Sequence, residues 1–246
     1  MNARNYLDLL RQMPIGSVDD LTSGLPFVVL APHPDDEALG TGGLIAAACE
    51  AGQAAAVVVI TDGSGSHPRS QLYPRQRLID LRRREVERAG ALLGLAPGQV
   101  SHLGLPDTRA PKEGPAFDAA ISAITAIVRQ AGARSLFTTW PGDPHCDHEA
   151  AALMALAVAR RLPELRLWAY PVWGWHLDPL LPVERPRPRG FRIDISRHQV
   201  RKHAALAAHV SQMTDLVSDD PDGFRFSAAT LEPFLGPFEY FVEMAR

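Results

Sequence analysis

The chain has 246 residues, enough for one large domain with a full hydrophobic core. Hydrophobic residues make up 46% of it and charged residues 22%, which argues against a disordered chain. The net charge of -3 gives no electrostatic case for a protein that binds nucleic acid or an anionic membrane surface.

The two cysteines, Cys49 and Cys146, form no CxxC pair, and this content is typical of a cytoplasmic protein. The first residues lack an apolar segment, so we expect no signal peptide. The most apolar stretch, residues 44–60, is interrupted by Glu50 and Gly52 and predicts helix, turn and strand in place of a membrane span. We therefore expect a cytoplasmic protein without a membrane span.

The predicted elements alternate along the chain. Residues before 25 are expected to form a helix followed by a polar turn at 17–20. Apolar runs at residues 27–31 and 54–60 predict buried strands without polar alternation, as in a parallel sheet that is covered on both faces. Further strands are expected at residues 100–103, 135–139, 165–170 and 191–195.

Apolar residues at helical spacing predict helices between the strands. The clearest helix is 76–93, which places Leu78, Val86 and Leu93 on one face and ends at Gly94. Further helices are expected at 44–49, 117–131, 149–161 and 198–213. The last thirty or so residues show no clear pattern.

This alternation of strand and helix predicts an α/β fold with a mostly parallel sheet and helices on both faces. We expect a single domain, with a core at about residues 25–171 and a C-terminal elaboration at about residues 172–246. The loop 63–74 and the segment 171–190 are expected to select the substrate.

Two polar clusters follow the predicted strands 27–31 and 135–139. They are His33-Pro-Asp-Asp-Glu37 and His145-Cys-Asp-His148. In a parallel sheet both strand ends lie at the same edge, which is where α/β proteins bind ligands. Histidine and paired carboxylates are costly to bury unless they are paired or bound to a metal. Two histidines and a carboxylate suit Zn²⁺ and leave a coordination position for water.

Each residue also has a purely structural interpretation. Asp35 or Asp36 is suited to cap a helix, and a single His-x-x-Asp arises easily by chance. Arg82 belongs to a run of three arginines and fits a solvated helix face, and Asp107 fits a Pro-Asp turn. Two such clusters at equivalent strand ends are much harder to obtain by accident. We therefore favour a metal site.

The segment Ala31-Pro-His-Pro-Asp-Asp-Glu37 resembles the signature of the PIG-L/LmbE-like family of zinc-dependent N-deacetylases, and Pro144-His-Cys-Asp-His148 resembles its second signature. Residues 82–94, 105–107 and 202–212 are also similar to the family, so the resemblance extends over about residues 25–240. Cys146 departs from the family, which usually has proline there. The resemblance implies a Rossmann-like three-layer domain that removes an acetyl group from an N-acetylated sugar conjugate of the N-acetylglucosamine type.

The resemblance also implies a ligand set. His33, Asp36 and His148 would hold one Zn²⁺ ion, with another divalent metal as the alternative. A bound Zn²⁺ lowers the pKa of its water from about 15.7 to about 7, so that hydroxide is available at neutral pH. The implied reaction is hydrolysis of a linear amide C–N bond by attack of this zinc-bound water.

Further roles follow from the same resemblance. Asp35 would be the general base, and a protonated His145 would stabilise the oxyanion or protonate the leaving amine. Asp147 would orient His145 from close by. Arg82 and Asp107 match positions that hold sugar hydroxyls in the family.

Other residues and function classes stay open at this point. Lys202, His209 and Gln212 fall near one helix face, where packing is the favoured interpretation, and packing is slightly favoured over sugar stacking for Trp173 and Trp175. The alternatives to the deacetylase are a metal-dependent amidase or other hydrolase on a non-sugar substrate, and a non-catalytic Rossmann-like binding module. A binding module should carry GxGxxG after its first strand, and the chain has only a partial match after its first polar cluster.

Overall fold

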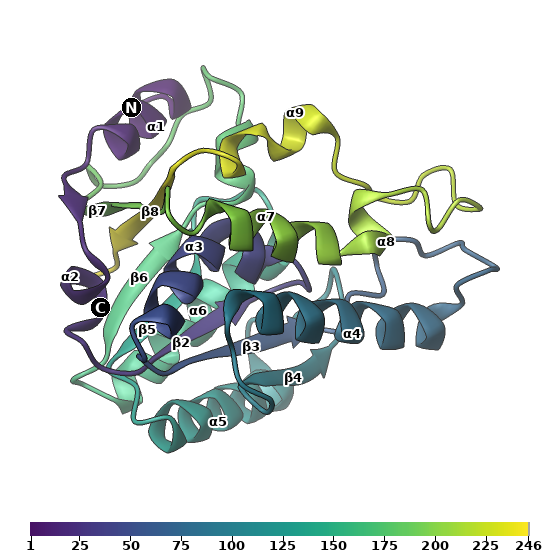
Figure 1. Ribbon diagram of the computed structural model, residues 1–246, viewed down its shortest axis with the longest axis horizontal. Helices are drawn as coiled ribbons and strands as arrows, with labels where there is room; N and C mark the ends of the chain where they lie inside the picture. The colour runs from purple at the N-terminus through teal and green to yellow at the C-terminus, as the bar shows by residue number, and fades with distance from the viewer. Residues whose placement is uncertain (246) are drawn as a thin grey trace.

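The structure is a computed structural model that describes residues 1–245. Its centre is one eight-stranded sheet with the order β1-β7-β8-β6-β5-β2-β3-β4 (Figure 1). Among the strands of residues 1–245, only β8 runs antiparallel to its neighbours. The strands are β1 Ile15–Gly16, β2 Phe27–Ala31, β3 Ala55–Thr61, β4 Val100–Leu105, β5 Ser135–Thr139, β6 Arg166–Tyr170, β7 Gly190–Asp194 and β8 Phe238–Glu243. The predicted α/β fold with a mostly parallel sheet is therefore confirmed.

Helices cover both faces of this sheet (Figure 1). One face carries α3 Asp36–Glu50, α4 Arg75–Leu93 and α7 Gln199–Ala208, and the other carries α5 Gly114–Gln130 and α6 Cys146–Arg161. Neighbouring residues of β2 reach opposite layers: Val29 packs in one core with Leu44, and Val28 packs in the other with Ile124. All five residues of β2 are buried, which explains why this strand has no polar alternation.

The predictions of individual elements were wrong at three places. The expected polar turn at 17–20 is helix α2, Val18–Thr22, because Ser17 and Asp20 form a reciprocal capping box. Helix α3 begins at Asp36, well before the expected residue 44. The helix expected at 198–213 is interrupted at His209, whose backbone is not helical. The shorter helices are α1 Ala3–Arg11, α8 Val210–Met213, α9 Ala228–Leu231, and the 3-10 helices η1 Trp173–His176 and η2 Glu232–Phe234.

The C-terminal strand β8 lies inside the sheet and fixes helix α3. Its residue Glu239 is buried and accepts hydrogen bonds from the backbone N–H groups of Gly43 at 2.7 Å and Leu44 at 2.8 Å. Glu239 also pairs with the buried Lys202 Nζ at 2.8 Å, so Lys202 packs inside the protein. Because the elaboration completes the sheet and holds α3, we propose that both parts of the chain form one domain.

Two further observations concern the protein's environment. Among residues 1–245, no helix combines the length and the apolar character that crossing a bilayer requires. Cys49 and Cys146 are both free thiols, and Cys146 is exposed. Its thiol donates a hydrogen bond to the Thr108 carbonyl at 3.2 Å.

Candidate active site

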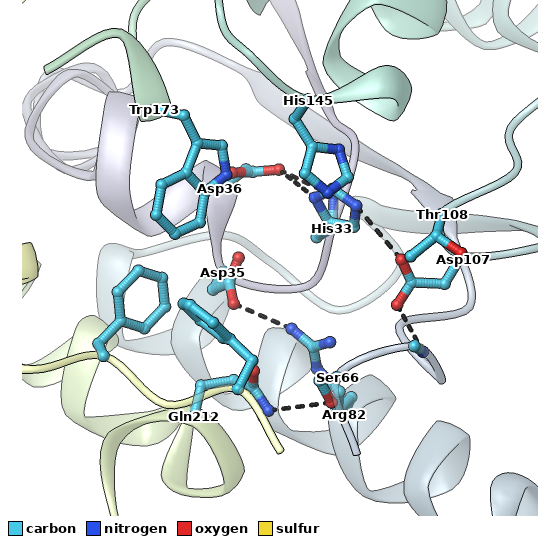
Figure 2. A pocket seen from close by; sticks show the side chains of 13 residues that line it. His33, Asp35, Asp36, Ser66, Arg82, Asp107, Thr108, His145, Trp173 and Gln212 are labelled. Carbon is cyan, nitrogen blue, oxygen red and sulfur yellow. Dashed lines mark hydrogen bonds and ion pairs between the residues drawn. The ribbon is translucent and has the colours of Figure 1, made fainter. Parts of the chain in front are cut away.

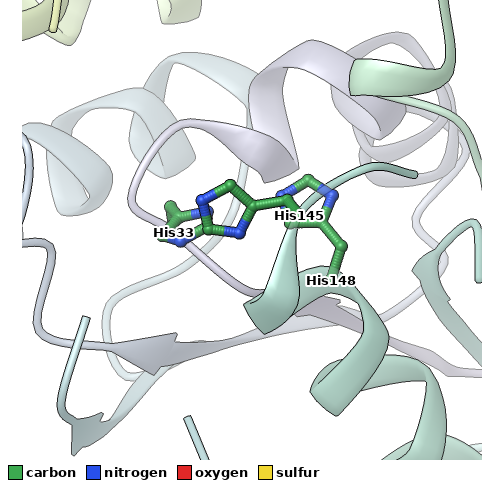
Figure 3. A group of neighbouring side chains, drawn as sticks. All are labelled: His33, His145 and His148. Atoms are coloured by element: carbon green, nitrogen blue, oxygen red, sulfur yellow. The ribbon is translucent and has the colours of Figure 1, made fainter. Parts of the chain in front are cut away.

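The two polar clusters lie together at one edge of the sheet. Strands β2 and β5 are parallel neighbours with Val29 opposite Phe137, so the loops that follow them leave the sheet side by side. Figure 3 shows the rings of His33, which follows β2, and of His145 and His148, at the start of α6, close to one another. The ring centre of His33 is 4.5 Å from that of His145 and 5.3 Å from that of His148.

Asp36 lies between two of these histidines. Its Oδ2 atom is 3.2 Å from His33 Nδ1 and 3.4 Å from His148 Nε2. His148 is fully buried, and its Nε2 atom has no hydrogen-bond partner. A buried nitrogen without a partner beside a carboxylate is an arrangement that a divalent cation would satisfy. The same Oδ2 atom also accepts a hydrogen bond from the backbone N–H of His33 at 2.9 Å, which fixes the carboxylate.

The opposite nitrogen of each ring is bound to a second carboxylate. His33 Nε2 is 3.0 Å from Asp147 Oδ2, and His148 Nδ1 is 2.8 Å from Asp143 Oδ2. Such outer carboxylates orient metal-binding histidines and fix their tautomers. Burial lowers the pKa of His148, but Asp36 and Asp143 outweigh this effect and raise it to about 9. The surroundings thus favour positive charge, and these residues fit a divalent metal ion.

Asp143 was not predicted as a site residue. It is buried and accepts hydrogen bonds from His148 Nδ1 and from the backbone N–H groups of Val172, Trp173 and Gly174. Asp143 therefore connects the segment after β6 to His148 through hydrogen bonds. The one local signal in the sequence was an aspartate five residues before His148 in the same polar loop.

We expect the variant Asp143→Asn to weaken metal binding about 10- to 100-fold, because His148 loses the carboxylate that orients it. Competition with a fluorescent zinc chelator measures this change directly. Asp178→Asn, in the exposed part of the same segment, is the control and should bind metal as the wild type does. Unchanged metal affinity in Asp143→Asn would show that His148 is oriented by its packing alone.

Asp35 lies beside the histidines with a strained backbone. Its φ angle is 147°, a value that favours glycine, and its side chain makes no capping hydrogen bond to α3. The carboxylate instead pairs with the buried Arg82, at 2.9 Å from Nη2. Burial raises the pKa of Asp35 to about 7, although the Arg82 charge acts to lower it. The helix-capping interpretation of Asp35 is thus wrong for its side chain, and the solvated-face interpretation of Arg82 is also wrong.

Two residues that the sequence did not assign to the site hold Asp35 in this conformation. The backbone N–H of Asp35 donates to Glu37 Oε2 at 3.0 Å. The other carboxylate oxygen of Glu37 lies 2.9 Å from His209 Nε2, and both side chains are fully buried. Arg82 adds a hydrogen bond from Nη2 to the Pro34 carbonyl at 2.7 Å. His209, at the interruption between α7 and α8, therefore supports the first loop from 172 positions away.

The structure changes the expected roles of His145 and Asp147. The Asp147 carboxylate does not face His145; it binds His33 and the backbone N–H groups of Thr108 and Ala110. Only the backbone N–H of Asp147 reaches His145, where it donates to Nδ1 at 3.2 Å. The proton of a neutral His145 ring is therefore on Nε2. Burial, together with the charges on His33 and His148, lowers the pKa of His145 to about 4, which favours this neutral form.

A cavity of about 180 Å³ opens beside these residues (Figure 2). Asp107 lines it and accepts a hydrogen bond from the Gly65 backbone at 2.7 Å, and Arg82 lines it with a buried Nε that has no partner. Thus both residues expected to bind substrate border the cavity. The complete lining is His33, Asp35, Asp36, Gly65, Ser66, Arg82, Asp107, Thr108, His145, Trp173, Gln212, Phe224 and Phe226. Of the two segments expected to select substrate, loop 63–74 contributes Gly65 and Ser66, and segment 171–190 contributes Trp173.

Comparison with known proteins relates this site to one family. The family model described as PIG-L, GlcNAc-PI de-N-acetylase, matches residues 28–159, more than half of the chain. No curated protein sequence shows significant similarity to the chain.

Several solved structures share the fold. The N,N'-diacetylchitobiose deacetylase from Pyrococcus horikoshii has a TM-score of 0.69 and 21% identity, over 98% of this chain and 91% of that chain. The zinc-inhibited form of the teicoplanin deacetylase Orf2 has a TM-score of 0.64 and 19% identity, over 89% and 97%. GalB, the 4-carboxy-2-hydroxymuconate hydratase from Pseudomonas putida KT2440, has a TM-score of 0.61 and 17% identity, over 90% and 97%. At these identities the likeness shows a common fold only.

Proposed function

The chain belongs to the PIG-L family of GlcNAc-PI de-N-acetylases, and from this premise we propose that it is a metal-dependent N-deacetylase. Its substrate in this proposal is a small N-acetylated sugar conjugate of the N-acetylglucosamine type. One observation carries the proposal: ring nitrogens of His33 and His148 both lie close to Asp36 Oδ2. The carboxylate of the adjacent Asp35 makes no capping hydrogen bond to α3.

We propose that His33, Asp36 and His148 hold the metal and that the metal is Zn²⁺. Nitrogen and carboxylate donors suit this ion, and the outer carboxylates Asp143 and Asp147 hold both rings in place. When bound, the ion polarises the amide carbonyl and lowers the pKa of water, which makes hydroxide available at neutral pH. The teicoplanin deacetylase described as inhibited by zinc is a reason to compare several divalent metals in the assay.

The protein's own groups would then move the protons. Asp35, with a pKa of about 7, takes a proton from the attacking water and returns it to the leaving amine, which cannot depart as an anion. His145 donates its Nε2–H to the oxygen on which negative charge develops, and its neutral state suits this role. Arg82 keeps Asp35 pointing at the reaction centre. We also propose a cytoplasmic location, which the two free thiols support.

The fold alone does not determine the reaction, since a hydratase shares it. We rank deacetylation first because the family model covers both polar loops and names this reaction. A non-catalytic binding module would not need a strained Asp35 whose carboxylate is buried against Arg82.

Metal removal tests the proposal. We expect the purified protein to release acetate from methyl N-acetyl-β-glucosaminide or diacetylchitobiose. Treatment with a chelator should abolish this activity, and one equivalent of Zn²⁺ per chain should restore it. Mass spectrometry of bound metal and quantification of free amine provide the two measurements. Acetate release that survives complete metal removal would contradict a metal-dependent reaction, and a metal-loaded protein that acts on no N-acetylated sugar would contradict the substrate class.

A further inference from the structure

One side of the cavity is aromatic. Trp173 of η1 lines the cavity (Figure 2), and so do Phe224 and Phe226 from the segment between α8 and α9. Trp173 and Phe226 are stacked with ring centres 6.0 Å apart, and Phe224 meets Phe226 edge-on at 4.8 Å. We call these three residues the aromatic wall. They lie outside residues 28–159, the part of the chain that matches the family.

Packing explains only part of the aromatic wall. Phe226 is buried in the main core, and Trp173 packs against that core. Phe224 is not part of that core: it is 36% exposed, and it lines the cavity. Its position is nevertheless fixed: its backbone N–H donates to the Ser66 carbonyl at 2.7 Å, and the Phe226 N–H donates to the Gln212 carbonyl at 2.9 Å. The cavity therefore presents a held, partly exposed aromatic ring.

A buried amide beside this wall has an unused acceptor. Glu85 accepts hydrogen bonds from the Ser211 backbone and hydroxyl, each at 2.7 Å, so the Ser211 hydroxyl proton is already donated. Gln212 lies 3.1 Å from that hydroxyl oxygen and must present its NH₂ group to it. The same NH₂ group reaches Ser66 Oγ at 3.3 Å. The remaining amide oxygen, Gln212 Oε1, is buried and has no partner.

We propose that the aromatic wall and Gln212 form the subsite for the ring of the substrate. The apolar C–H face of a pyranose lies against Phe224, and one ring hydroxyl donates to Gln212 Oε1. A purely apolar ligand would leave this oxygen unpaired, whereas a hydroxylated ring satisfies both surfaces. At about 180 Å³ the cavity is smaller than the roughly 300–1,000 Å³ of drug-sized sites, so it holds one ring and the rest of the conjugate extends outward.

This inference rests on the proposed function. It assigns the recognition of the substrate's ring to residues outside 28–159, the part of the chain that matches the family. Two ligands distinguish the contact with Phe224 from the hydrogen bond to Gln212. Methyl N-acetyl-β-glucosaminide has an apolar face and hydroxyls, and N-cyclohexylacetamide has a ring of the same size without hydroxyls. Dissociation constants for both are measured through intrinsic tryptophan fluorescence, to which Trp173 contributes, on zinc-loaded protein that also carries Asp35→Asn, so that the sugar is not hydrolysed during the titration. Acetate release is measured separately.

We expect Phe224→Ala to weaken the binding of both ligands about tenfold. Gln212→Met should weaken the binding of the sugar about tenfold and leave N-cyclohexylacetamide within about twofold, because only the hydroxyl contact is lost. The control Trp175→Phe should change neither, since Trp175 packs against Tyr240 away from the cavity lining. Melting temperatures establish that each variant is folded.

The outcomes separate the two proposals. If Phe224→Ala binds both ligands as the wild type does, the ring subsite is overturned, even when acetate is released. If Gln212→Met weakens both ligands equally, the hydroxyl contact is overturned. Ring binding that depends on Phe224 in a protein that releases no acetate would overturn the proposed reaction and leave the subsite standing.

Discussion

Replacement of Asp35 by asparagine is expected to lower kcat about 10²- to 10⁴-fold, the usual contribution of a positioned general acid or base. Asparagine keeps the size of the side chain, but it cannot take a proton from water or return one to the amine. Because Asp35 is not among the proposed ligands, the bound metal should stay at one ion per chain. The substrate KM should change little, since the substitution removes a proton-transfer group and leaves the cavity in place.

Steady-state kinetics and mass spectrometry of bound metal measure these two effects on the same sample. The control is Asp118→Asn, an exposed aspartate on α5, which should retain full activity. If Asp35→Asn keeps more than about a tenth of the wild-type kcat, another group moves the proton. If Asp35→Asn also loses the metal, Asp35 is a metal ligand, and the roles proposed for Asp35 and Asp36 have to be exchanged.

Replacement of His148 by glutamine should remove both metal and activity. His148 Nε2 is the buried nitrogen without a partner that faces Asp36, so no other atom of this ring can complete the site. We expect metal content below about a tenth of an ion per chain and a loss of kcat/KM of at least about 10³-fold, since the ion supplies several kcal/mol to the transition state. Glutamine is chosen because alanine would remove the polar side chain that lies between the Asp36 and Asp143 carboxylates.

The matched control is His203→Gln on the exposed side of α7, which should bind metal normally. Circular dichroism and thermal melting show whether His148→Gln is folded. A folded variant that still binds one metal ion with wild-type affinity would remove His148 from the ligand set. His145 would then be the next candidate, because one ring nitrogen each from His33, His145 and His148 lie within 4.8 Å of one another.

The sequence by itself determined the features that depend on residues close together in the chain. The strands of the parallel core could be predicted, since burial on both faces leaves an apolar run without alternation, as in β2. The two polar clusters could be placed at one edge of the sheet, because each directly follows such a strand. Their identity as a candidate metal site follows from the same local patterns.

Only the tertiary structure decided which groups these clusters contact. The Asp147 carboxylate reaches His33 across 114 positions, and His209 reaches Glu37 across 172 positions, so neither pairing has a local signature. Strand β8 and the position of Phe224 and Phe226 at the cavity were missed for the same reason: their environment is provided by distant parts of the chain. Hydrogen bonds and packing act over a few ångströms in space, and the spacing of residues along the chain does not encode such distances.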